Sequence, residues 1–352
     1  MINIGDYHSA VSFIVSEIKN FPKHLVPKIV IRSGNLKSPG ISDLDFLIGF
    51  PDDFLYGNAF IEEFNLLIKN MKYKDVFFLH LPNIYPISSL LDLPKYTFNE
   101  IDNCEIILGE NLFNNNTAIC DEQIIIRSIE FIHSRIIDFL IKILTNNFHA
   151  NKLLVEGHSF IHSYNAITKL GINLNKQLFK NFLMIEEFRD NIVQGKKVDI
   201  IEEDCKKLYE GICSEFYFLL KQFYILFQKN VAMHFEKNLN FHKYDDRVML
   251  ENLSNEDSVD LNVDIKNNVY KINGFSWELR CLFDNLFLKK DQYKTVFINE
   301  SFEQEILNKR NYLKKLYQFN FLNFGNAHGR SGFTPLVTGK VFDRLAKQLI
   351  DV

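Results

Sequence analysis

The first hundred residues alternate short apolar runs with polar turns. Residues 7–19 carry apolar side chains every three to four positions, which predicts an amphipathic helix. Two apolar runs, at residues 29–31 and 46–48, flank a polar loop rich in Gly, Ser and Pro, a pattern typical of a strand, a turn and a second strand. A second helix is expected over residues 60–70, and a third strand over residues 75–81.

The middle of the chain has a helical period. A long loop is predicted over residues 82–103, which hold three prolines, and a short apolar run follows at residues 106–109. Beyond this run, apolar residues recur every three to four positions. The expected helices cover residues 122–145, 158–170, 179–193 and 201–235. Apolar residues surround the last of these from Phe216 onward, which is typical of the central member of a bundle.

The final third changes character. Residues 261–272 alternate between apolar and polar positions around Asn267 and Asn268, and we expect a hairpin there because Asn tolerates the positive φ of a tight turn. Helices are expected over residues 302–317 and 339–350. The sequence therefore predicts an α+β protein with three segments: a small mixed-sheet domain over residues 1–116, a helical bundle over 117–236 and a smaller α+β segment over 237–352.

Two acidic residues stand at the start of the second predicted strand. Asp43 and Asp45 flank Leu44, and since side chains alternate between the faces of a strand, the two acids point the same way while Leu44 points into the core. Two carboxylates on one rigid face repel each other unless a cation lies between them. Oxygen ligands of this kind suit a hard divalent ion such as Mg²⁺.

The stretch Gly34-Asn35, a short loop and then Ser42-Asp43-Leu44-Asp45 before an apolar strand resembles the nucleotidyltransferase superfamily that includes DNA polymerase beta and kanamycin nucleotidyltransferase. The resemblance covers roughly the first hundred residues. It implies that Asp43 and Asp45 bind catalytic Mg²⁺. Two features depart from the family: Asn35 replaces the usual Ser or Gly, and the loop between Asn35 and Asp43 has seven residues, shorter than in familiar members.

The same resemblance assigns roles to the loop. Gly34 and Asn35 would let the backbone approach the phosphates of a nucleoside triphosphate, and Lys37 would supply a counter-charge. Ser42 would orient the loop or a phosphate oxygen.

The family generally places a third acid on a later strand, and two residues compete for this position. Asp75 begins the predicted strand 75–81 and His80 lies five positions later, so in a strand the two would face opposite sides. We favour Asp75 because a carboxylate holds a metal directly, whereas a neutral imidazole can act as a base but adds no negative charge.

The composition of the chain limits the kinds of partner that we expect it to bind. The net charge is −4 and the Lys and Arg residues are dispersed, which argues against binding to a nucleic-acid duplex. No membrane-spanning or targeting segment is visible, and five cysteines without a CxxC pattern fit a reducing cytoplasm. His158 and His162 are more typical of a polar helix face than of a metal site, and the Gly-rich residues 325–332 are more typical of an ordinary loop than of a phosphate cradle.

These features together indicate an Mg²⁺-dependent enzyme that moves a nucleoside monophosphate from a triphosphate to a small-molecule or protein acceptor. Two alternatives stay open. The altered Gly34-Asn35 turn and the short loop also fit a catalytically inactive protein of the same fold that senses nucleotides or acts as an interaction module. The other alternative is a helical interaction module with a small sheet, in which residues 28–50 would lie outside a mixed sheet.

Overall fold

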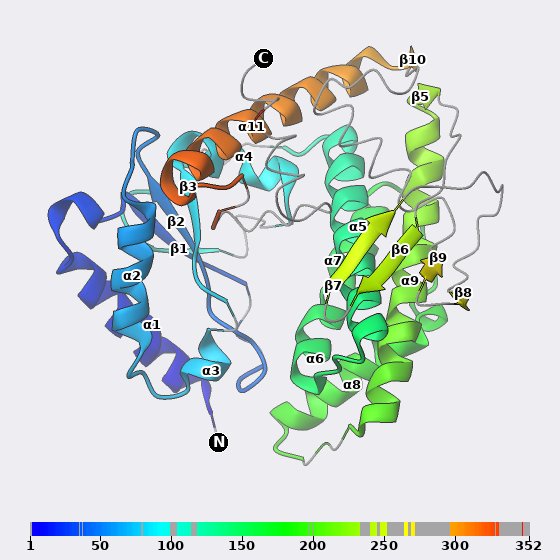
Figure 1. Ribbon diagram of the computed structural model, residues 1–352, viewed down its shortest axis with the longest axis horizontal. Coiled ribbons are helices and arrows are strands. Elements are labelled where there is room, and N and C mark those ends of the chain that lie inside the picture. The colour runs from blue at the N-terminus through cyan, green and yellow to red at the C-terminus, as the bar shows by residue number, and fades with distance from the viewer. Residues whose placement is uncertain are drawn as a thin grey trace. The chain divides into compact units, whose positions relative to one another are not determined.

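The structure is a computed structural model of the chain, shown in Figure 1. It describes residues 2–34, 36, 38–78, 80–98, 104–113, 118–196, 198, 200–232, 240–244, 247–251, 264–266, 269–271, 296–327, 329–330 and 347. The chain divides into two compact units. The first comprises residues 1–119, 187–198 and 309–352, and the second comprises residues 120–186 and 199–308.

A four-stranded mixed sheet forms the centre of the first unit. Its strands are β1 (Ile29–Ser33), β2 (Asp45–Phe50), β3 (Asn83–Pro86) and β4 (Glu105–Leu108), in the order β3-β2-β1-β4. β1 is antiparallel to both of its neighbours, and β3 runs parallel to β2. The predicted α+β class and the mixed sheet around residues 28–50 are confirmed, which counts against the interpretation as a helical interaction module.

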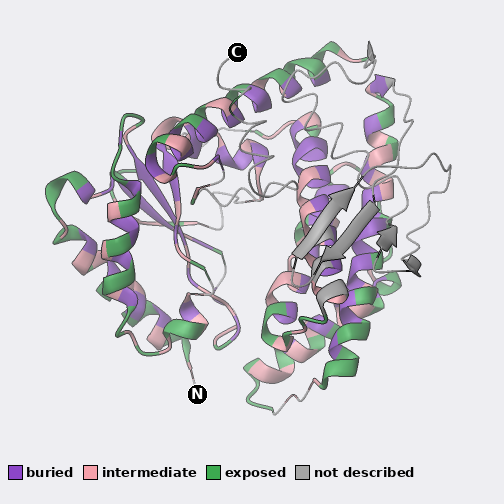
Figure 2. Ribbon diagram, in the orientation of Figure 1, coloured by how far each residue is buried: buried purple, intermediate pink, exposed green. Residues whose placement is uncertain are grey.

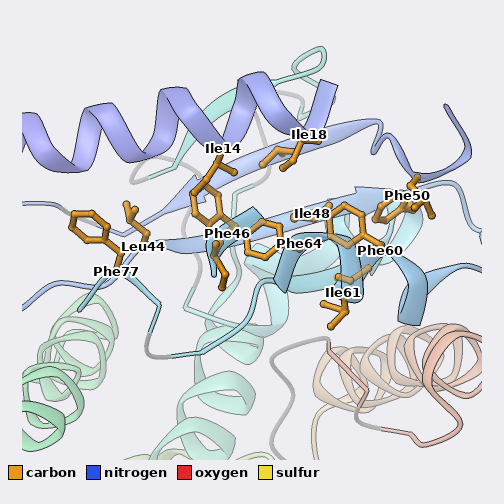
Figure 3. Packing of buried hydrophobic residues seen from close by; sticks show 14 of the residues in the cluster. Ile14, Ile18, Leu44, Phe46, Ile48, Phe50, Phe60, Ile61, Phe64 and Phe77 are labelled. Carbon is orange, nitrogen blue, oxygen red and sulfur yellow. The ribbon is translucent and has the colours of Figure 1, made fainter. Parts of the chain in front are cut away.

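Alternation along β2 directs large side chains to one face of this sheet. Phe46, Ile48 and Phe50 are almost fully buried, and they pack against α1 (Ile4–Lys19) and α2 (Gly57–Ile68), as Figure 3 shows. α1 begins with a capping box formed by Asn3 and Asp6, which satisfies N–H groups that the first turn leaves without partners. Both predicted helices are confirmed.

The opposite face of the sheet is covered by α4 (Ile87–Tyr96). Gly49 on β2 makes room for it, because a Cβ atom there would lie 2.8 Å from Leu90 and 2.9 Å from Ile87. The prediction of a long loop over residues 82–103 is wrong, since β3 and α4 fall inside it. The prolines were interpreted as signs of a loop, but Pro86 is the last residue of the edge strand β3 and the N-cap residue of α4. Both positions tolerate a missing N–H group.

The predicted strand over residues 75–81 is also wrong. Residues Lys74–Phe77 form the short helix α3, entered through Tyr73 at a left-handed φ of 63°. The aromatic side chain of Phe77 is buried, with its ring 4.6 Å from that of Tyr7. A short apolar run has the same composition in a buried strand and in a buried helical turn, so periodicity does not distinguish them.

The long helix α11 (Glu300–Phe324) contributes its second half to the first unit. Asn323 is buried and accepts a hydrogen bond from the Gly57 amide at 2.8 Å, while its Nδ2 donates to the Phe54 carbonyl at 2.8 Å. The helix predicted at 302–317 is thus confirmed and longer. A separate C-terminal α+β segment is not seen among the described residues, because these contacts join residues 309–324 to the N-terminal sheet unit. The further helix predicted at 339–350 lies outside the described residues except for residue 347.

The second unit is mostly helical, as predicted. It contains α5 (Asp121–Thr145), α6 (Ala150–His158), α7 (Phe160–Lys169), α9 (Glu202–Gln228) and the first half of α8 (Lys180–Val193). Figure 2 shows buried residues along α5 and α9, where Phe139 and Phe216 meet with ring centroids 5.7 Å apart. The helix expected at 158–170 is in fact the end of α6 and then α7, and the helix expected at 201–235 ends at Gln228.

Two small sheets complete the second unit. β5 (Val231–Ala232) pairs with β10 (Val296–Phe297), and β6 (Asn240–Tyr244), β7 (Arg247–Glu251), β8 (Asp264–Lys266) and β9 (Val269–Lys271) form a sheet in the order β7-β6-β9-β8. β8 and β9 are antiparallel at the position of the expected hairpin. The proposed turn residues Asn267 and Asn268 lie outside the described residues. The division into three consecutive segments stays a prediction.

Glu215 of α9 caps the start of α8. Its carboxylate accepts hydrogen bonds from the backbone amides of Asn181 at 2.8 Å and Phe182 at 3.0 Å, and from Asn181 Nδ2 at 2.8 Å. Burial raises the pKa of the Glu215 carboxyl, and these donors oppose that shift. The amides concerned are among those that a helix N-terminus leaves without partners in the helix itself.

We expect Glu215→Ala to lower the free energy of unfolding by about 1–3 kcal/mol, because it leaves buried amides without an acceptor. Urea denaturation followed by circular dichroism measures the change. Glu210→Ala is the matched control, since Glu210 is exposed on the same helix and its loss should change stability by no more than about 0.5 kcal/mol. Equal shifts for the two variants would contradict the capping role.

Candidate functional site

Three side chains meet at one end of the sheet in the first unit. Asp45 is the first residue of β2 and Asp43 precedes it by two positions. His80 Nε2 lies 2.6 Å from Asp45 Oδ1 and 3.7 Å from Asp43 Oδ2. One ligand atom from each of the three residues lies within 4.8 Å of the others.

The group is accessible to a ligand. The side chain of Asp43 is 14% exposed, that of Asp45 is 35% exposed and that of His80 is 46% exposed. Water and small ions can therefore reach the two acids without any rearrangement of the core.

The buried residue between the acids sets their direction. Leu44 is 2% exposed, and its amide donates to the Phe77 carbonyl at 2.7 Å. Leu44 lies in the core just before β2 begins, whereas Asp43 and Asp45 on either side of it both lie beside His80. The prediction that these two acids share one face is confirmed by their common contact with His80.

The chain turns directly beside Asp45. Ser33, the last residue of β1, lies opposite Asp45 in the antiparallel pair, and Gly34 follows with a left-handed φ of 82°. A Cβ atom on Gly34 would lie 4.0 Å from Asp45 Oδ2. The backbone at Gly34 is therefore the part of the turn that comes near the carboxylate, and glycine adopts this φ without strain.

Two residues from other elements hold the loop between β1 and β2. The Tyr7 hydroxyl of α1 donates to the Ser42 carbonyl and accepts from the Gly40 amide at 3.1 Å. Burial raises the pKa of Tyr7, and the charge of Asp43 adds to that shift. Arg189 of α8 donates through Nη2 to Ser38 Oγ at 3.2 Å.

Sequence reasoning did not identify these two anchors. Tyr7 lies on the apolar face of α1 and is indistinguishable there from a core residue. Arg189 is separated from Ser38 by about 150 positions in the chain, and no local pattern links them.

His80, rather than Asp75, joins the acid pair. Asp75 is exposed in α3 and is not a member of the group around Asp43. β2 and β3 pair in parallel with Leu47 opposite Asn83, and His80 stands three positions before the start of β3. The third side chain beside the two acids is therefore His80, which comes from the segment just before β3. The role of Asp75 stays a prediction that this geometry does not favour.

Charge pairing controls the protonation of His80. The hydrogen bond to Asp45 raises the pKa of His80 from 6.5 to about 9, with further contributions from the charges of Asp45 and Asp43, although burial opposes the shift. His80 Nδ1 lies 2.9 Å from the Leu81 carbonyl, which suits a protonated nitrogen. At neutral pH the ring is an imidazolium that neutralises part of the charge of the two carboxylates.

The three side chains offer donor atoms of the kinds that divalent cations bind. Asp43 and Asp45 alone suit Mg²⁺, which favours carboxylates and water. With the imidazole of His80 as a third ligand, the set would also accept softer divalent ions.

The other predicted binding residues have mixed outcomes. Asn35 and Lys37 lie outside the described residues. Ser42 is described, and its carbonyl is the group that accepts from Tyr7. In the Gly-rich tail, the Arg330 carbonyl accepts a hydrogen bond from the Ile84 amide of β3, so this backbone protects the sheet edge; His328, Ser331 and Gly332 are outside the described residues.

The histidine pair on the helical unit is a polar surface feature, as expected. His158 Nδ1 lies 2.6 Å from Glu186 Oε1, and the ring of His162 packs edge-on to Phe131 at 6.2 Å. Neither histidine belongs to a group of possible metal ligands within the described part of the chain.

Comparison with protein-family models, with curated proteins and with solved structures finds no match for this chain. Among the described residues, no helix is both long enough and apolar enough to cross a membrane.

The shifted pKa of His80 gives a direct test of the group. In metal-free protein, the ring C–H signals of His80 followed by NMR should titrate near pH 9, and Asp45→Asn should move the midpoint down toward 6.5 because the principal hydrogen-bond acceptor is lost. Asp75→Asn is the control and should leave the midpoint unchanged. A midpoint near 6.5 in the unaltered protein would contradict the pairing.

The sign of the effect on stability follows from linkage. Since folding raises the pKa of His80, the pairing stabilises the fold fully below about pH 6.5 and the contribution is lost as the pH rises through about 9.

Proposed function

We propose that the chain is an Mg²⁺-dependent nucleotidyltransferase that moves a nucleoside monophosphate from a nucleoside triphosphate to a hydroxyl group of an acceptor. The observation that supports it best is the position of Asp43 and Asp45 at the start of β2, beside the left-handed Gly34 turn. Two convergent carboxylates next to an accessible backbone turn suit a metal ion that also contacts phosphates.

The metal, when bound, would stabilise the negative charge that develops on the attacking and leaving oxygens. Asp43 and Asp45 would hold it, and Tyr7 and Arg189 fix the loop that carries the first of them. The Gly34 backbone would lie close to the phosphates. Asn35, Lys37 and Ser42 are the proposed further contacts to the triphosphate.

His80 is the candidate base. A cation held by Asp43 and Asp45 would offset the negative charge that keeps His80 protonated in the metal-free chain, which favours the neutral ring. The acceptor oxygen forms a bond to the α-phosphorus as the bond to pyrophosphate breaks, and the hydroxyl proton passes to Nε2 of this neutral imidazole. His80 Nε2 is the atom that faces both acids, so this proton transfer would take place beside the metal ligands.

The acceptor is a small molecule or a protein, and a nucleic-acid duplex is not proposed because the basic residues are dispersed along the chain. The four described cysteines, Cys104, Cys120, Cys205 and Cys213, are not joined by disulfides, which suits a reducing compartment such as the cytoplasm.

A specific observation favours a second candidate. An imidazolium where the family generally has a third acid lowers the negative charge available for a second metal ion. The chain would then bind a nucleotide without transferring it and act as a nucleotide sensor or an interaction module. Titration calorimetry separates the candidates, because tight nucleotide binding without release of pyrophosphate supports the sensor.

Transfer activity tests the leading proposal. The protein is incubated with each labelled triphosphate, Mg²⁺ and a metabolite extract, and labelled product and pyrophosphate are measured. Asp43→Asn and Asp45→Asn should abolish transfer, and His80→Ala should lower it at least about 10²-fold, the lower end of a general-base contribution.

Asp75→Asn is the matched control for these variants, since it removes an exposed carboxylate near the site without touching the group. Unchanged circular dichroism spectra would show that the variants are folded. Absence of both label transfer and pyrophosphate from the unaltered protein would refute the enzymatic proposal, and loss of activity in Asp75→Asn alone would restore Asp75 as the third acid.

A further inference from the structure

An apolar cavity lies on the face of the sheet that carries the acids. It measures about 400 Å³ and is lined by Ile31 and Leu47 of the sheet, Leu90 and Leu93 of α4, and Cys104 and Ile106 near β4. This volume is within the range of about 300–1,000 Å³ that is usual for small-molecule sites. All of these residues belong to the first unit.

Strand alternation places this cavity next to Asp45. Leu47 follows Asp45 by two positions on β2, and Ile31 precedes Ser33 by two positions on β1, so each pair shares a face. Ser33 lies opposite Asp45 in the antiparallel register. The cavity therefore begins one step along the sheet from the acid pair.

Cys104 links the cavity to the acids through side chains. Burial raises the pKa of the Cys104 thiol, and the charge of Asp45 adds to this shift. A hydrogen bond with Ser33 and the charge of Arg32 act in the opposite direction and lower the pKa. A residue that lines the cavity is thus within electrostatic reach of Asp45. The same face is closed farther along by α4, where Gly49 meets Leu90 and Ile87.

The lining decides what kind of group the cavity accepts. Its side chains are almost all aliphatic or aromatic, with Cys104 and Asn111 as the polar exceptions. A nucleobase has several donors and acceptors at its edges, and burying them without partners costs binding energy. An apolar ring system with a single hydroxyl group has no such ring donors or acceptors, so its burial does not carry this cost in binding energy.

We propose that the cavity binds the apolar body of the acceptor, an alcohol with an aromatic or alicyclic framework of about bicyclic size, whose hydroxyl group points toward Asp45 and His80. This assignment rests on the proposed function and names the class of its second substrate. The hydroxyl oxygen bonds to the α-phosphorus of the triphosphate, pyrophosphate leaves, and the proton passes to His80.

Binding of 2-naphthol to the full chain tests the cavity itself. We expect saturable binding with a Kd on the order of 0.1 mM, as befits a ligand of this size, and shifts of the methyl NMR signals of Leu47, Leu90 and Leu93. Ile106→Phe fills the cavity from the half-buried strand β4 and should weaken binding at least about tenfold.

Leu112→Phe is the matched control, because Leu112 is exposed and is not a lining residue although Asn111 and Phe113 are. It should bind 2-naphthol as the unaltered chain does. Absence of saturable binding, or equal binding by a folded Ile106→Phe variant, would overturn the proposal.

Paramagnetic Mn²⁺ tests whether the cavity serves the acid site. Mn²⁺ bound at Asp43 and Asp45 should broaden the ring signals of His80 and relax the protons of bound 2-naphthol, and Asp45→Asn should remove both effects. If His80 is broadened while bound 2-naphthol is not relaxed, the acceptor assignment is wrong. If Mn²⁺ does not bind at all, the proposed function fails and the acceptor role with it, whereas the Ile106→Phe comparison still reports on the cavity alone.

Discussion

The position of Leu44 is the constraint on which the rest of the site depends. Its side chain is buried and its amide is bonded to the Phe77 carbonyl, so the strand that follows cannot shift by one residue without exposing Leu44, Phe46, Ile48 and Phe50 together. A shift of that kind would also carry Asp43 and Asp45 into the core, where unpaired carboxylates are costly. The burial of four apolar side chains therefore holds two acids at the surface, close enough to repel each other.

That repulsion explains the chemistry around the acids. In the metal-free chain, His80 relieves it by holding a proton to about pH 9. A divalent cation bound between the two carboxylates would relieve the same repulsion. The loop before the acids is fixed by Tyr7 and Arg189, so a ligand would find the arrangement preformed, which lowers the entropy lost on binding.

The two faces of the sheet are packed differently. One face is filled by aromatic residues beneath α1 and α2 (Figure 3) and gives the first unit its rigid core. The other face is closed by α4 only where Gly49 allows a close approach, and an apolar cavity lies on this face near Asp45. Gly49 thus lets α4 pack closely against this face of the sheet.

Local patterns in the sequence were enough for the elements with a clear period and for the direction of the acid pair. The strands around residues 28–50 and the long helices α5, α9 and α11 follow from their apolar spacing, because such spacing directly reflects which face is buried. Asp43 and Asp45 follow from the alternation of a strand and from the Gly34 turn. Residues 74–77 and 83–96 did not follow, since a short apolar run and three prolines fit several structures.

Only the tertiary structure decided what surrounds the acids. His80 was one of two open candidates, and its position beside Asp45 and Asp43 depends on contacts between segments that are distant from one another in the sequence. Arg189, Cys104 and the residues of α4 come from distant parts of the chain, and their contacts with the loop and the cavity depend on packing between elements. No spacing within a single segment encodes those contacts, because each depends on side chains that meet only when the chain is folded.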